Sequence, residues 1–156
     1  MGETPASQLH AMTQKWDAMY ESGARDGKAL LLLAFRLRQF SQKYVTDRKY
    51  AHQFSVFVQA HHATQYDRAI IISHVVCARE FLEASECLEA SECLEARAYR
   101  DALNHTQKAL VLCLAHKDTC MDLMKDVLFC QKEAWCGLGE PTEMLSTVRV
   151  IAKLPS

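Results

Sequence analysis

Apolar residues recur along most of this 156-residue chain at intervals of three or four positions, the period of an amphipathic α-helix. The first stripe lies between a helix-start signal and a helix-stop signal, which predicts a helix from Thr4-Pro5 to Ser22-Gly23. Its members are Leu9, Met12, Trp16 and Met19. A second helix is predicted from Asp26 through Tyr44, and its wide apolar arc indicates a central position.

The same period predicts further helices over 47–61, from 64 or 67 to 84, 98–114, 118–135 and 141–151. Asp118 is the expected cap of the helix over 118–135, which should end at Gly137 and Gly139. Pro141 is suited to the first turn of the last helix. Because the connections are short, consecutive helices should lie antiparallel.

Composition strengthens this reading, because residues 28–136 contain neither glycine nor proline. A sheet needs several tight turns, and tight turns need those residues. We therefore predict an all-α protein, an antiparallel helical-hairpin bundle of six to seven helices. It is expected to form a single helical domain over 1–156, with possible sub-modules 5–63 and 64–152.

A hexapeptide, Leu-Glu-Ala-Ser-Glu-Cys, occurs at 82–87 and again at 88–93, and a third copy begins at 94–96. Six residues rotate a helix by about 600°, so equivalent positions of the two copies do not share a face. Removing one copy restores a continuous apolar stripe. We interpret the repeat over 82–96 as an insertion that lengthens a helix or forces an irregular turn near 86–93.

Charge and cysteine content narrow the binding partners and the cellular compartment expected for this chain. The formal net charge is −1, which does not favour nucleic-acid binding. An odd number of cysteines, seven, without a signal-peptide pattern favours a reducing compartment, the cytoplasm or the nucleus. The longest apolar runs are too short to cross a bilayer.

Catalytic motifs are not recognisable in the sequence, which holds no glycine-rich phosphate loop, nucleophile elbow or zinc-protease helix. The best metal-binding candidates are Cys113, His116 and Cys120, but a helix boundary near 117–119 should separate them. We expect these cysteines to be core residues, His74 to be buried and hydrogen-bonded, and His61-His62 to diverge. The chain is thus predicted to be no enzyme and to need no cofactor, with a small metal- or redox-active protein as the alternative.

The segment Ala98-Tyr99-Arg100-Asp101-Ala102-Leu103, followed by Lys108-Ala109-Leu110, resembles the second helix of a tetratricopeptide hairpin and of MIT (microtubule-interacting and transport) modules. The resemblance implies a protein-interaction adaptor that binds a partner helix or peptide in an interhelical groove. Candidate contacts are Tyr99, Arg100 and Lys108. A second surface, formed by Arg36, Arg38 and Lys43, would suit an acidic peptide or an anionic membrane.

A broader resemblance covers about 66–132 and rests on Asp67-Arg68, Ile72-Ser73-His74 and Lys108-Ala109-Leu110. This segment is similar to the tandem MIT-type C-terminal domain of autophagy-initiating protein kinases, and the similarity implies a tethering module. A purely structural oligomer is a third possibility, favoured if the stripe Met12, Trp16 and Met19 is exposed.

Overall fold

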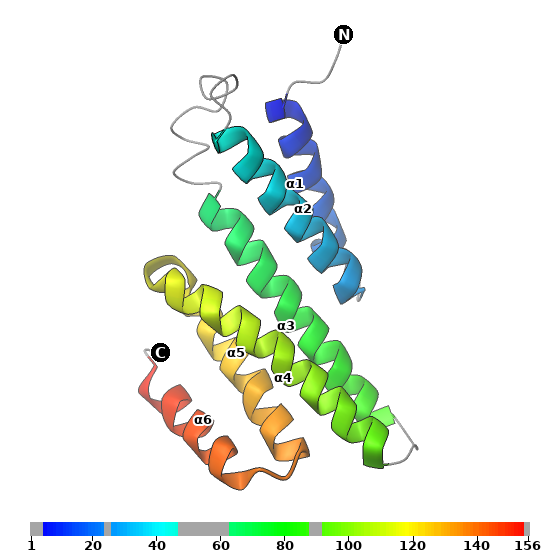
Figure 1. Cartoon of the computed structure of the whole chain (residues 1–156), viewed down its shortest axis with the longest axis vertical. Coiled ribbons are helices and arrows are strands. Elements are labelled where there is room, and N and C mark those ends of the chain that lie inside the picture. Colours follow the sequence, from blue (N-terminus) through cyan, green and yellow to red (C-terminus); the bar gives the residue numbers. More distant parts are fainter. Residues whose placement is uncertain (1–4, 24–25, 47–62, 88–91, 155–156) are drawn as a thin grey trace. The chain divides into compact units, whose positions relative to one another are not determined.

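The computed structural model describes residues 5–23, 26–46, 63–87 and 92–154 (Figure 1). These residues form α-helices and no strand, which confirms the all-α prediction. The helices are α1 (Pro5–Glu21), α2 (Gly27–Thr46), α3 (Ala63–Cys87), α4 (Glu92–Ala115), α5 (Lys117–Gly137) and α6 (Pro141–Lys153). The helix predicted over 47–61 and the pair His61-His62 lie outside the described residues.

The chain divides into two compact units, Met1–Ser73 and His74–Ser156. The division falls inside α3, which contributes residues to both units, whereas the sequence suggested sub-modules meeting at 63 and 64. Each unit has its own buried apolar residues, so each is described in turn.

In the first unit α1 packs against α2, and the chain turns between them where glycine permits it. Gly23 adopts a φ of 71°, a left-handed value that side chains disfavour. The Asp26 carboxylate then accepts a hydrogen bond from the Ala29 backbone N–H at 3.1 Å, which caps α2. The end of α1 and the start of α2 therefore lie where the sequence predicts them, beside Gly23 and Asp26.

Trp16 lies in the core of the first unit with Leu30, Leu37 and Tyr66. Its indole N–H donates to the Ser73 hydroxyl at 3.2 Å, and that hydroxyl donates to the Ala69 carbonyl at 2.7 Å. The buried indole is thereby satisfied. Met12 and Met19 are half-buried, so the stripe that could have favoured a structural oligomer contributes to the packing of this unit.

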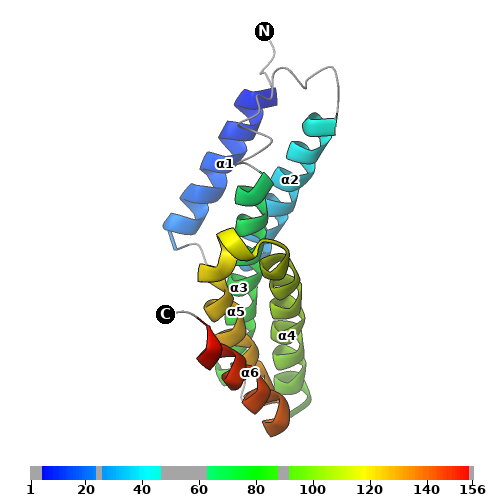
Figure 2. The same cartoon turned by 90° about the vertical axis from the view of Figure 1, so that its left-hand side faces the viewer.

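In the second unit α5 packs against α4 on one side and α6 on another, as the two views in Figures 1 and 2 show. Small buried residues, Ala102, Ala109 and Ala134, leave room for close approach of the helix backbones. Gly139, with a φ of 71°, and Pro141 separate α5 from α6, as predicted.

Two helix starts in the second unit differ from the sequence prediction. α4 begins at Glu92 rather than near 98, because the repeat is rich in good helix formers and carries no stop signal there. His116, not Asp118, occupies the N-cap of α5, and Asp118 lies in the first turn, where the helix dipole favours a carboxylate. Residues 88–91 of the repeat lie outside the described residues, so its interpretation as an insertion stays a prediction.

Candidate functional site

α6 is the least covered helix of the second unit. Thr147 is its buried residue, and its hydroxyl donates to the Glu143 carbonyl at 2.9 Å. Leu145, Val148 and Val150 keep 50%, 39% and 47% of their surface exposed. Apolar side chains therefore reach solvent on both flanks of α6. This is unusual, because a surface helix normally carries a single apolar stripe that its neighbour covers, and among the described helices α6 packs mainly on α5.

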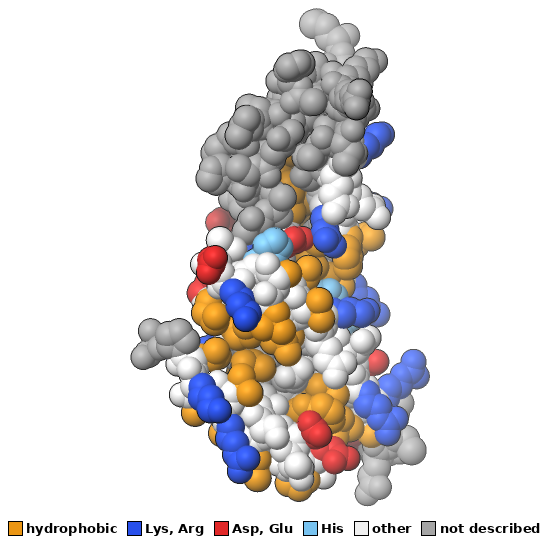
Figure 3. Space-filling view, turned by 60° about the vertical axis from the view of Figure 1, so that its left-hand side comes forward, with side chains coloured by type: hydrophobic (Ala, Val, Ile, Leu, Met, Phe, Trp, Pro, Cys, Tyr) orange, Lys and Arg blue, Asp and Glu red, His pale blue; other side chains and the backbone are white. Residues whose placement is uncertain are grey.

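A groove of about 450 Å³ runs between α4 and α6, with α5 as its floor. Within the described residues, α4 and α6 both pack on α5 and hardly touch each other. The apolar lining consists of Leu110, Leu114, Met121, Met124, Leu128, Val150 and Leu154. Figure 3 shows hydrophobic side chains gathered on the surface of this part of the molecule, with lysines and arginines at its margin.

The groove has a buried floor and exposed walls. Met124 and Leu128 on α5 are buried, whereas Leu114 on α4 and Val150 on α6 are about half exposed, at 49% and 47%. Each wall presents apolar residues four positions apart, one turn of helix, which is the spacing that another helix can match. Covering the exposed half of each such side chain would contribute about 1 kcal/mol.

The first unit contains a smaller cavity, of about 150 Å³, lined by residues that include Trp16, Leu37 and Tyr66. Burial raises the pKa of the Tyr66 phenol, and a hydrogen bond between Tyr66 and Thr13 acts in the opposite direction. The volume of this cavity suits a few water molecules rather than a protein segment. The larger groove is therefore the better candidate for a partner site.

A pair of histidines lies beside the core of the second unit. Nδ1 of His74 on α3 lies 2.9 Å from Nδ1 of His105 on α4, and the Phe81 ring stacks on His105. Burial, together with the charges of His105 and Lys108, lowers the pKa of His74 to about 4. The prediction that His74 is buried and hydrogen-bonded is confirmed; its partner was not foreseen.

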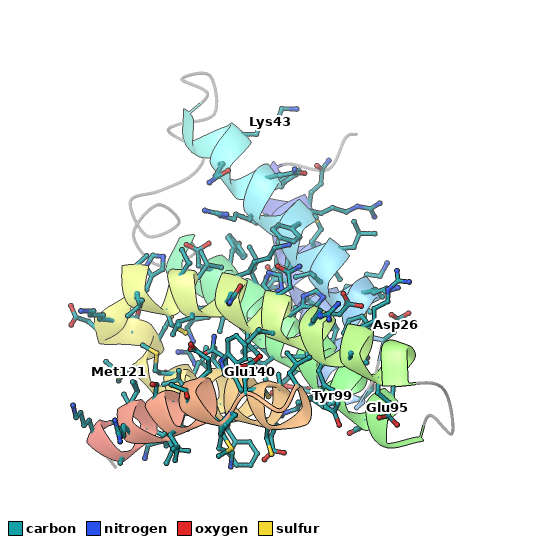
Figure 4. All side chains as sticks on the ribbon, turned by 60° about the horizontal axis from the view of Figure 1, so that its bottom comes forward. Asp26, Lys43, Glu95, Tyr99, Met121 and Glu140 are labelled. Atoms are coloured by element: carbon teal, nitrogen blue, oxygen red, sulfur yellow. The ribbon has the colours of Figure 1, made fainter. Side chains whose placement is uncertain are left out.

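The structure does not gather the residues proposed from the tetratricopeptide resemblance into one site. Tyr99 is half-buried near the start of α4 and packs against Gly137, where α5 ends. Arg100 and Lys108 are exposed on α4. Tyr99 and Met121 lie toward opposite ends of the layer formed by α4, α5 and α6 (Figure 4).

The three cations proposed on α2 have different surroundings. Arg36 and Lys43 are exposed and, seven residues apart, share one face of the helix. Figure 4 shows the Lys43 side chain projecting away from the ribbon. Arg38 instead forms an ion pair with Asp67 on α3, at 3.0 Å from Nε to Oδ1.

The cysteine side chains that the structure describes in the second unit lie mainly in its core. Cys113 and Cys120 are fully buried, and α4 ends at Ala115 so that His116 lies between two helices, near the predicted boundary. Among the described residues, no three histidine, cysteine or acidic side chains converge as metal ligands. Burial raises the pKa of the Cys130 thiol, although the neighbouring Arg79 acts to lower it.

Sequence reasoning placed part of the groove but missed its α6 wall. The period of the helix predicted over 118–135 places Met121, Met124 and Leu128 on one face, whereas no pattern in the sequence singles out Val150 and Leu154. The available signal was the wide apolar arc of α6, which includes Leu145, Val148 and Val150. None of the described helices is long and apolar enough to cross a membrane.

Comparison of the chain with protein-family models, with curated proteins and with solved structures gives no match.

Proposed function

We propose that the protein is a non-catalytic interaction module that binds a helix of a partner protein in the groove between α4 and α6. The observation that carries this proposal is the pair of half-exposed apolar walls, represented by Leu114 and Val150, on two helices that pack on α5 and hardly touch each other. This is also the role implied by the resemblance of 98–110 to tetratricopeptide and MIT helices.

A helix is the partner that such a groove suits best. Three helices packed in this way leave one corner of a four-helix arrangement vacant. A helix laid in that corner would place side chains at i, i+3, i+4 and i+7 against Leu114, Met121 and Val150. An extended strand would find no unpaired sheet edge in the described residues to which it could bond.

The proposal can be tested by selecting binders from a displayed library of amphipathic helical peptides against the full chain. The selected peptides should bind wild-type protein and lose at least tenfold in affinity for Leu114→Asp and for Val150→Asp. A carboxylate on either wall would have to be desolvated under the peptide, which is costly. Titration calorimetry gives the affinities.

The chain offers a matched control for each variant. Val111→Asp alters an exposed residue of α4, and Val148→Asp alters an exposed residue of α6, both outside the groove lining. These controls should bind the selected peptides as wild type does. If no helical peptide is selected, or if the groove variants and their controls bind alike, the groove is not the partner site.

A second candidate contact surface is the exposed face of α2 that carries Arg36 and Lys43. Two cations on one helix face favour an anionic lipid surface over an apolar ligand. Co-sedimentation with vesicles rich in phosphatidylserine, compared between wild type and Arg36→Glu/Lys43→Glu, tests this surface. Equal sedimentation of the two proteins would eliminate it.

A further inference from the structure

We infer that the helix bound between α4 and α6 carries carboxylates toward its N-terminus and a cation toward its C-terminus, and that it lies antiparallel to both walls. This inference rests on the proposed function, because it describes the occupant of the same groove. Three kinds of observation point to it: the charges at the two ends of the groove, the directions of the wall helices and the spacing of the charged residues.

One end of the groove is cationic. Lys117 lines it at the start of α5. Lys153 lies three residues after Val150 and seven after Ser146, two lining residues, so it occupies the same edge of α6. Because α6 returns along α5 after the short turn at 138–140, these two lysines lie at the same end.

The other end of the groove carries a carboxylate. Glu143 precedes Ser146 and Thr147 by three and four residues, which places it on the groove edge of α6, in the first turn. Within the described part of the chain, neither Glu143 nor the two lysines form an ion pair. Each therefore remains available to a charge on the occupant.

The walls themselves contribute no negative side chain between these ends. Residues 102–115 of α4 and 144–154 of α6 contain no aspartate or glutamate, whereas α6 adds Arg149. An occupant with acidic residues beside Lys117 and Lys153 thus meets no carboxylate on either wall between the two ends of the groove. In the reversed helix, like charges would meet at both ends of the groove, and their repulsion disfavours that orientation.

The dipoles of the two wall helices favour the same orientation. The C-termini of α4 and α6, at Ala115 and Lys153, lie at the cationic end of the groove, and both carry partial negative charge. An occupant antiparallel to them places its partially positive N-terminus at that end. Carboxylates in the first turn of the occupant, which stabilise a helix by themselves, then meet the two lysines.

The spacing of the charges fixes the length of the recognised segment. Glu143 and Lys153 are ten residues apart on α6, a rise of about 15 Å. The matching helix therefore carries its acidic and basic residues about three turns apart, with two or three apolar residues on the face between them.

Two synthetic helical peptides of equal composition test the inference. Both carry the same leucine face and blocked termini; one has glutamates in its first turn and lysines in its last, and the other has these charges exchanged. The acidic-first peptide should bind the full chain about threefold to tenfold more tightly, since each solvent-exposed pair contributes little. High salt should reduce the difference.

Exchange of the protein charges provides the decisive comparison. Lys117→Glu/Lys153→Glu/Glu143→Lys should prefer the peptide with lysines first, while Lys125→Glu, outside the groove lining, should keep the wild-type preference. Circular dichroism checks that the variants remain helical. The orientation inferred here is refuted if wild type binds both peptides equally or if exchange leaves the preference unchanged. Retained binding in Leu114→Asp would instead refute the groove as the binding site.

Discussion

Nδ1 of His74 and Nδ1 of His105 lie 2.9 Å apart, so the two rings share one proton in this contact. One ring must donate its N–H and the other must accept with a bare nitrogen. Protonation of both rings would set two N–H groups against each other in a partly buried contact. The contact therefore exists only while at least one ring is neutral.

This pair makes stability depend on pH in the acidic range. The pKa of His74 is about 4 in the folded protein, against an ordinary value of 6.5, so the unfolded chain binds more protons between these pH values. The contribution of neutral His74 to the free energy of unfolding is complete above about pH 6.5 and is lost as the pH falls toward 4. The loss approaches about 3 kcal/mol.

Urea unfolding at a series of pH values measures this effect. His74→Gln should flatten the dependence of the free energy of unfolding on pH between 4 and 6.5 relative to wild type. Replacement of the exposed His10 by glutamine should leave the dependence unchanged. Parallel curves for wild type and His74→Gln would show that His74 is not the group responsible.

A second prediction concerns Gly137. A Cβ added there would overlap the ring of Tyr99, so Gly137→Ala should force the ring to move and destabilise the second unit by about 1–2 kcal/mol. In a Tyr99→Ala background the same change should be neutral or stabilising, because alanine favours the helix. Thermal unfolding of the four proteins of this double-mutant cycle measures the coupling. Equal effects of Gly137→Ala in both backgrounds would contradict the contact.

The ion pair between Arg38 and Asp67 gives a third prediction. The Asp67 side chain is 12% exposed and that of Arg38 is 38% exposed, so removal of the arginine leaves a mostly buried carboxylate. Arg38→Met should destabilise the protein by about 1–2 kcal/mol, below the cost for a fully buried pair. Arg36→Met, on an exposed position of the same helix, is the matched control and should have little effect. Equal denaturation midpoints of the two variants would rule out a structural role for the pair.

Much of this fold can be predicted from the sequence, because the helix ends are marked by residues with strong local preferences. Pro5, Gly23, Asp26 and Pro141 act within one turn of backbone, and the structure places helix ends beside them. The start of α4 was misplaced because the repeated glutamates and alanines favour a helix throughout and provide no start signal.

The groove could be predicted only in part because it depends on contacts distant in sequence. Periodicity assigns Leu110, Met121 and Met124 to inner faces, but it does not show that, among the described helices, α6 packs mainly on α5 and leaves Val150 exposed. The same limit applies to His105, whose contact with His74 joins residues 31 positions apart. Long-range partners follow from packing, which no local pattern encodes.

The sparse covering of α6 predicts that this helix opens before the rest of the second unit. Thr147 is its buried residue, whereas α5 buries seven, so opening α6 exposes little apolar surface. In hydrogen exchange followed by mass spectrometry, amides of α6 should exchange faster than those in the middle of α5. A peptide bound in the groove should slow exchange in α6 and at the end of α4 more than near Tyr99, which lies toward the other end of the layer. Protection of α6 equal to that of α5 without peptide, or unchanged protection with a bound peptide, would contradict this account of α6 as the open wall of a helix-binding groove.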